Sequence, residues 1–168
     1  MNARNVVRGA SALLVATVAL FFTLVVFGNL TDYGSNYAFV EGVLKMDTTF
    51  GSPSIMWRSI ESSAVHHAFY WSIILWEAVV AVLAWIGAGA LFKNIRKSSA
   101  DFDKAKGWAL AALAGGMLLW LLAFITVGGE WFAMWQSSTW NGTAPAFRMF
   151  TVLGVVFLIL MHKDNGGK

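Results

Sequence analysis

The sequence contains no cysteine, only two prolines and few charged residues. Of its 168 residues, 12% are charged and 58% are hydrophobic. The lack of cysteine excludes disulfides, thiolate metal sites and thiol nucleophiles. Soluble domains carry about 25% charged residues, so the composition argues against a soluble protein. The chain also has no GxSxG, Walker A or HExxH pattern, and these motifs mark common hydrolases, nucleotide-binding enzymes and metalloproteases. We therefore expect no enzymatic activity.

Four long apolar runs divide the chain. A transmembrane helix needs about 20 apolar residues, and the fourth run suffices because Pro145 suits the first turn of a helix. These runs predict an all-α fold, namely a transmembrane antiparallel four-helix bundle in one domain. A secretory signal peptide is the alternative for the first run, but this run is too long for a typical signal sequence. The predicted spans are residues 9–30, 70–92, 108–127 and 146–161.

Lysine and arginine are unevenly distributed between the two sides of the predicted bundle. Nine lie in the head, the 93–107 connector and the tail, and three lie on the other side. Cytoplasmic loops are enriched in these residues, so we expect a bacterial inner-membrane protein with both termini in the cytoplasm. The net charge of +3 then reflects topology, and no nucleic-acid partner is expected. The loops 31–68 and 128–145 are expected to be periplasmic.

The 31–68 loop is predicted to be ordered. Ser35 and Asn36 can cap a helix over residues 37–46. Glu41 and Lys45 have the favourable i, i+4 spacing on its polar side. We expect the chain to become helical again at Ile55 and to continue without a break into the second span. The apolar side of the short helix comprises Phe39, Val40, Val43, Leu44 and Met46.

Small residues recur at intervals of four in three of the predicted spans. Helices in lipid pack closely where small residues meet, so these positions are expected to form contacts between spans or with another protein. They are Ala12 and Ala16, then Ala84 and Ala88, then Gly107, Ala111 and Gly115.

Glu77 is a carboxyl group within an apolar run, where ionisable groups are costly and usually functional. On one helix, His66 and Tyr70 share its face. One interpretation is a proton relay or ligand pocket. The favoured one is a buried carboxyl that bonds a neighbouring helix, because a relay normally needs more than one intramembrane carboxylate.

Arg148 lies in the first turn of the fourth span, where the helix dipole disfavours a cation. We expect an acidic partner, and Glu130 is favoured over Asp32 and Glu77. Binding of an external anion or a lipid phosphate is the alternative.

No cofactor is predicted. A bis-histidine haem needs two ligands at one depth, but His66 and His67 are adjacent while His162 is at the opposite end of the bundle. A metal site that combines these adjacent histidines with Asp32, Glu41 or Asp47 is a weaker alternative.

The string NLTDYGSNYAFVEGVLKMDTTF at residues 29–50, followed by Trp57-Arg58-Ser59-Ile60 and a His before the second span, is similar to the family of small bacterial integral membrane proteins of unknown function. The resemblance implies a four-span inner-membrane protein with an ordered loop. Glu41 and Gly42 depart from the expected polar residue and histidine, which weakens a metal or proton role for the loop. The positions that the resemblance nominates are Asp32, Asn36, Asp47, Arg58, His67 and Glu77.

Three functions fit the sequence. The first is an accessory or assembly subunit of a larger membrane complex, for instance a respiratory one. It rests on small size and an ordered loop that can dock a partner. The second is a small homo-oligomeric transporter or ion-coupled carrier that uses Glu77 and Arg148. The third is a membrane enzyme acting on a lipid or quinone. Membrane lipids, other subunits or further copies of the chain are the expected partners.

Overall fold

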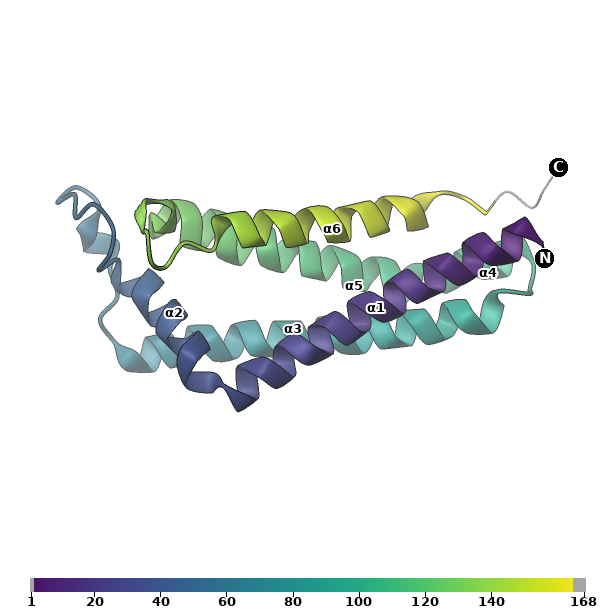
Figure 1. The fold of residues 1–168 in the computed structure, drawn as a ribbon, viewed down its shortest axis with the longest axis horizontal. Helices are drawn as coiled ribbons and strands as arrows, with labels where there is room; N and C mark the ends of the chain where they lie inside the picture. The colour runs from purple at the N-terminus through teal and green to yellow at the C-terminus, as the bar shows by residue number, and fades with distance from the viewer. Residues whose placement is uncertain (1, 165–168) are drawn as a thin grey trace.

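The computed structural model describes residues 2–164, and this part of the chain is helical with no strand. Four helical segments run antiparallel and are long and apolar enough to cross a membrane. The predicted fold class is confirmed. Figure 1 shows that α1 begins and α6 ends at one end of the bundle, called here the terminal end. The opposite end carries α2 and is called the α2 end. The four segments are α1(Ala3–Thr31), α3(Ser63–Asn94), α5(Gly107–Leu118) with its continuation η2(Leu119–Trp131), and α6(Thr143–Met161).

Each span extends beyond its predicted bounds. The first begins at Ala3 rather than residue 9, because the Asn2 side chain accepts a hydrogen bond from the Arg4 amide and caps the helix. The third continues through Trp131, so the loop that follows it begins four residues later than the predicted residue 128. Pro145 lies in the first turn of α6 as predicted. The Asn141 side chain likewise accepts a hydrogen bond from the Thr143 amide at the start of α6, and hydropathy alone does not detect such polar contacts at helix ends.

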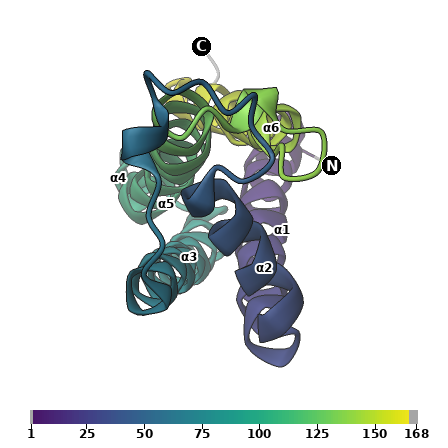
Figure 2. The same ribbon diagram turned by 90° about the vertical axis from the view of Figure 1, so that its left-hand side faces the viewer.

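α2 (Tyr33–Lys45) crosses the α2 end of the bundle, as Figure 2 shows from that side. The predicted cap at Ser35 and Asn36 is wrong, since the helix already begins at Tyr33. The predicted apolar side is confirmed, and its residues pack against the Phe132–Met134 segment in a small second core. Met46 ends the helix with a left-handed backbone at φ 56°.

The loop from α2 to α3 is not a helical lead-in to the second span. Only a 3₁₀ turn forms there, η1 (Met56–Arg58), and α3 begins at Ser63. The predicted continuous helix from Ile55 is therefore wrong. The amide of Ile60 instead donates a hydrogen bond to the carbonyl of Leu44 at 2.9 Å. This bond draws the extended segment onto α2, which prevents it from joining the helix.

Close packing between α3 and α5 depends on glycine. A Cβ at Gly87 would overlap the Ala109 backbone, so the two helices can approach only without it. Ala84 and Ala88 are buried as predicted. On the third span, Gly107 and Ala111 are exposed, so these two residues do not pack between spans and the alternative of contact with another protein stays open for them. The buried residues of α5 are Ala109, Ala112, Leu113 and Gly116.

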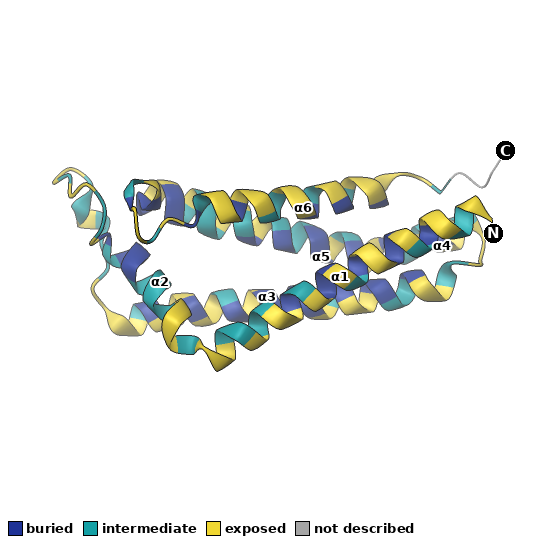
Figure 3. Cartoon of the chain, in the orientation of Figure 1, coloured by how far each residue is buried: buried dark blue, intermediate teal, exposed yellow. Residues whose placement is uncertain are grey.

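Burial follows the inner side of each span, with exposed residues outside (Figure 3). The main core joins residues from all four segments, including Phe22, Leu91, Leu113 and Leu153. Many large apolar residues remain exposed along the spans, as expected for surfaces that face lipid.

η2 is a π-helix of 13 residues. A side chain shows the same spacing, because the Thr126 hydroxyl donates a hydrogen bond to the Leu121 carbonyl five residues earlier. π-helical segments are rare and usually limited to a single turn. At the terminal end, a short helix, α4 (Ser99–Ala105), forms within the connector.

Candidate functional site

Glu77 lies on the side of α3 that faces α1, and only 2% of its surface is exposed. The Asn29 side-chain amide donates a hydrogen bond to the Glu77 Oε2 atom at 2.7 Å. Because Asn29 belongs to α1, the carboxyl group bonds a neighbouring helix, as the favoured interpretation predicted. Asn29 itself was missed, although it is the only side-chain amide within the first apolar run.

Tyr70 and His66 share this buried face of α3 with Glu77. The Tyr70 hydroxyl donates to the backbone carbonyl of Asn29 at 3.1 Å. The His66 Nε2–H donates to the Ile60 carbonyl at 2.7 Å, so its Nδ1 atom is the free ring position. Nδ1 is 4.0 Å from Glu41 Oε1. The three groups therefore lie on one face as predicted, but they do not bond one another: Glu77 and Tyr70 bond Asn29, and His66 bonds Ile60.

Glu41 and Lys45 form the predicted i, i+4 ion pair on α2, with 2.6 Å between Lys45 Nζ and Glu41 Oε1. The Lys45 hydrogen bond lowers the pKa of Glu41, and the same bond raises the pKa of Lys45. Both side chains are about a third exposed, so the pair lies at the surface of α2.

His67 is exposed and lies apart from His66. Its Nδ1 atom is 2.8 Å from the Tyr33 hydroxyl, and its ring stacks on Tyr37 with 4.3 Å between centroids. These aromatic contacts join α2 to the start of α3. Asp32, Asn36 and Asp47 are exposed. Within residues 2–164, no group of three His, Asp or Glu side chains is arranged to hold a metal ion.

Arg148 and Glu130 do not form the predicted pair. Both are exposed, and no ion pair joins them in the described part of the chain. Glu130 belongs to the last turn of η2 and not to the loop after the third span, where the prediction placed it. Arg148 is also separate from Glu77, which is buried between α1 and α3. Solvent at the helix end stabilises an exposed cation without a partner.

Arg58 packs over two tryptophan rings, Trp57 and Trp131, which meet edge to face. Its guanidinium carbon is 4.9 Å from the Trp131 ring centre and 5.6 Å from the Trp57 ring centre. Its Nη1 atom donates to the Trp131 carbonyl at 3.2 Å. No carboxylate pairs with Arg58 among the described residues. This position, nominated by the resemblance, thus holds a cation against the aromatic side chains of two loops.

Arg8 was treated only as a topological charge, yet it is fully buried at the terminal end. Its ion pair with Asp164 joins α1 to the segment after α6. This bond lowers the pKa of Asp164. No sequence signal separates Arg8 from the other basic residues, since its burial results from three segments meeting. Its remaining contacts are to the carbonyls of Ile95 (2.7 Å) and Lys97 (2.8 Å), the Ser99 hydroxyl (3.4 Å) and the Phe102 ring (4.8 Å).

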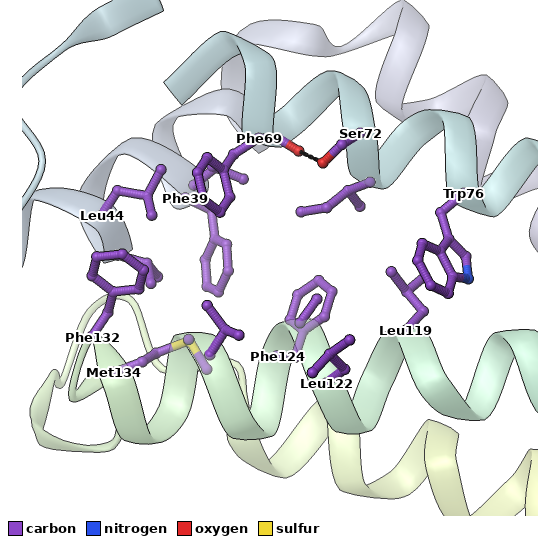
Figure 4. A pocket seen from close by; sticks show the side chains of 16 residues that line it. Phe39, Leu44, Phe69, Ser72, Trp76, Leu119, Leu122, Phe124, Phe132 and Met134 are labelled. Carbon is purple, nitrogen blue, oxygen red and sulfur yellow. Dashed lines mark hydrogen bonds between the residues drawn. The ribbon is translucent and has the colours of Figure 1, made fainter. Parts of the chain in front are cut away.

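An apolar cavity of about 230 Å³ lies within the described part of the chain. It lies between α3 and η2, and α2 closes one end of it (Figure 4). Its walls contain no charged residue. The one hydroxyl, on Ser72, donates to the Phe69 carbonyl of its own helix. No sequence pattern predicted this cavity, because its walls come from three separate segments. Figure 4 labels Phe39, Leu44, Phe69, Ser72, Trp76, Leu119, Leu122, Phe124, Phe132 and Met134 around it.

Comparison with known proteins gives one match. The family described as "Predicted small integral membrane protein (DUF2165)" matches residues 7–163. The chain belongs to this family. The resemblance seen in the sequence is thereby confirmed, and the protein is a multi-pass integral membrane protein that contacts lipid. No curated protein and no solved structure matches the chain.

In this family member, the ionisable groups of the α2 end mainly hold helices together. Glu77, Tyr70 and His66 join α3 to α1 and to the loop before α3. Two features are apolar or aromatic and take no part in joining these helices: the cavity and the exposed aromatic side chains of the loops, such as Phe50 and Trp135. Features of this kind are typical of binding sites.

Proposed function

We propose that the protein is an accessory or assembly subunit of a larger complex in the bacterial inner membrane, for instance a respiratory complex, and has no catalysis of its own. The observation that supports this proposal is an exposed aromatic pair on two ordered loops at the α2 end. Phe50 is 74% exposed and Trp135 is 51% exposed, and their rings meet edge to face with 5.9 Å between centroids.

This pair is held in place. The Phe50 amide donates to the Gln136 side chain at 3.0 Å, and the Thr48 and Ser137 hydroxyls are 2.6 Å apart. In Figure 1 the loop after α2 extends past the ends of α5 and α6. Large aromatic residues that are rigid and exposed are typical of binding hot spots. A partner subunit at this end would cover them.

The orientation belongs to the same proposal. Within the described residues, eight lysines and arginines lie at the terminal end or in its connector and three lie elsewhere, which favours a cytoplasmic location for both termini. The aromatic pair would then face the periplasm, and the partner would have a periplasmic surface.

The carrier hypothesis has weaker support. It requires Glu77 and Arg148 in one wet cavity, but Glu77 is bonded to Asn29 and Arg148 is exposed on α6. The cavity contains neither residue.

The test is purification of the tagged protein from its native membrane in mild detergent, followed by sizing and mass spectrometry. We expect a stoichiometric larger complex. Phe50→Ser combined with Trp135→Ser should release the partner, because the variant loses its anchoring rings. Trp108→Ser is the matched control, since Trp108 is 54% exposed at the terminal end, and it should retain the partner.

Two outcomes would contradict the proposal. One is a homogeneous single-chain oligomer from the native membrane. The other is a complex that survives the double substitution, since the two rings would then serve only as interfacial side chains in the lipid headgroup region.

A further inference from the structure

We infer that the cavity between α3 and η2 holds an acyl chain of an anionic phospholipid, whose phosphate binds Arg58. This site is independent of the proposed partner surface at Phe50 and Trp135, and it can be tested on the purified protein alone.

The cavity opens sideways, toward the membrane. Trp76 on α3 and Leu122 on η2 line it, and each is also more than 40% exposed on the outside of the bundle. They mark the two sides of the opening, and both lie within spans that face lipid. The molecule that meets this opening is therefore a lipid chain rather than water.

The walls suit a hydrocarbon chain. A water molecule occupies about 30 Å³ of liquid, so a cavity of about 230 Å³ has several times the volume of one water molecule. Its polar atoms already have partners, because the Trp76 indole N–H donates to the Gly115 carbonyl at 3.0 Å. Water would gain no hydrogen bonds there, while an empty space would lose dispersion contacts. A flexible chain restores those contacts.

The charge beside the cavity indicates the headgroup. Arg58 donates to the Trp131 carbonyl, and Trp131 directly precedes Phe132 of the cavity wall. Two residues later, the Ile60 amide bonds the carbonyl of Leu44, another wall residue. Arg58 is thus fixed at the α2 end of the cavity, above its apolar walls.

Arg58 is also available for an anion. It has no carboxylate partner in residues 2–164, and its buried Nε atom has no hydrogen-bond partner. The guanidinium packs over the rings of Trp57 and Trp131. Arginine binds phosphate through paired N–H donors, and tryptophan is enriched at the level of lipid headgroups. A cation above an apolar cavity matches an anionic lipid.

The experiment uses purified protein in phosphatidylcholine vesicles that contain a small fraction of phosphatidylglycerol with a diazirine on its acyl chain. After irradiation, labelled residues are mapped by mass spectrometry. We expect several-fold more label on the cavity walls than on exposed residues of α6 such as Leu158. Uniform labelling of all lipid-facing residues would overturn the inference, as would cavity walls that take no label.

Ala123→Phe fills the cavity, because Ala123 lines it. This variant should lose most of the wall labelling and keep the labelling of α6. Ala111→Phe is the matched control, as Ala111 is an exposed alanine of the same span, and it should label like the wild type. Unchanged wall labelling in Ala123→Phe would overturn the inference.

Arg58→Gln tests the headgroup without altering the cavity. The wild type should label several-fold more with the phosphatidylglycerol probe than with a phosphatidylcholine probe of the same chain. Arg58→Gln should lose this preference, and Arg148→Gln, at an exposed arginine of α6, should retain it. A preference that persists in Arg58→Gln would contradict the role of this residue.

Discussion

Glu77 and Asn29 bring two polar side chains together inside an apolar environment. The hydrogen bond joins α1 to α3 near the α2 end, and the Tyr70 hydroxyl adds a second bond to the same residue of α1. In a bilayer, unsatisfied polar groups find no water to bond. Pairing Glu77 with Asn29 therefore reduces the free-energy cost of burying the Glu77 carboxyl group, and it fixes the rotation of α3 relative to α1.

Glu77→Gln should leave folding nearly unchanged, because a glutamine oxygen can accept the same bond from Asn29. Glu77→Leu should destabilise the protein by about 0.5–1.5 kcal/mol, the range found for polar contacts between membrane helices. Thermal unfolding in detergent measures both changes. In a protein that already carries Glu77→Leu, the further change Asn29→Leu should lower the stability only slightly. If the two single losses of stability added fully in the double variant, the pairing would be contradicted.

Sequence reasoning identified Glu77 from its position in an apolar run but could not identify Asn29 as its partner. The depth of each residue is readable from its span, whereas the rotation of one helix against another is not. The expected Glu130–Arg148 pair failed for the same reason. Both residues were assigned to the correct end, but the structure leaves them exposed and apart.

At the scale of elements, α2 packs closely against the bundle at Gly42, because a glycine leaves room there for the indole ring of Trp140. A Cβ at Gly42 would overlap the Trp140 indole. The resemblance marked Gly42 as a departure from an expected histidine, and the structure gives its physical reason, because no larger side chain fits beneath Trp140.

Gly42→Ala should destabilise the protein by about 1–3 kcal/mol, as overpacking does in other cores. Gly34→Ala is the control on the same helix, since nothing lies within 4 Å of a Cβ there, and it should be neutral or stabilising because alanine favours helix. Limited proteolysis of the loops and thermal unfolding report both effects. Equal behaviour of the two variants would show that α2 does not depend on this contact.

Hydropathy predicted the four spans and the apolar side of α2, since both follow from periodic burial. It did not predict the break between η1 and α3. That break depends on the hydrogen bond from Ile60 to Leu44, which joins residues on separate elements. Local propensity contains no information on such a contact.

For the whole molecule, the Arg8–Asp164 pair closes the terminal end by joining the first helix, the connector and the segment after α6. The pKa of Asp164 is lowered by Arg8, so the pair stabilises the fold above the ordinary carboxyl pKa. This stability is lost as pH falls through the lowered value.

Asp164→Asn should reduce stability at neutral pH by about 1.5–3 kcal/mol, the range for hydrogen bonds to charged groups. The difference between variant and wild type should begin to shrink as pH falls below about 4, the ordinary carboxyl pKa. It should vanish as the folded wild-type carboxyl is protonated at its lowered pKa. Thermal unfolding across pH measures this difference. Lys163→Gln, an exposed neighbour, is the control, and a difference independent of pH would contradict the ion pair.

The orientation can be measured directly because the chain has no native cysteine. Ser54→Cys places a thiol at the α2 end and Ala100→Cys places one on α4, both at exposed positions. A membrane-impermeant maleimide should label Ser54→Cys in spheroplasts and Ala100→Cys only after lysis. The reverse pattern would place the termini outside the cytoplasm.

The π-helical η2 segment has a consequence for how relatives of this chain are aligned. Bonds over five residues make each turn wider than an α-helical turn, so a chain that lost residues here would move back toward α-helix. Its flanking positions would rotate relative to α6, and the side chains of the lipid-facing opening would turn with them. A short gap between Leu119 and Trp131 is therefore more than a neutral length difference. It would distinguish family members that keep this cavity from those that have closed it.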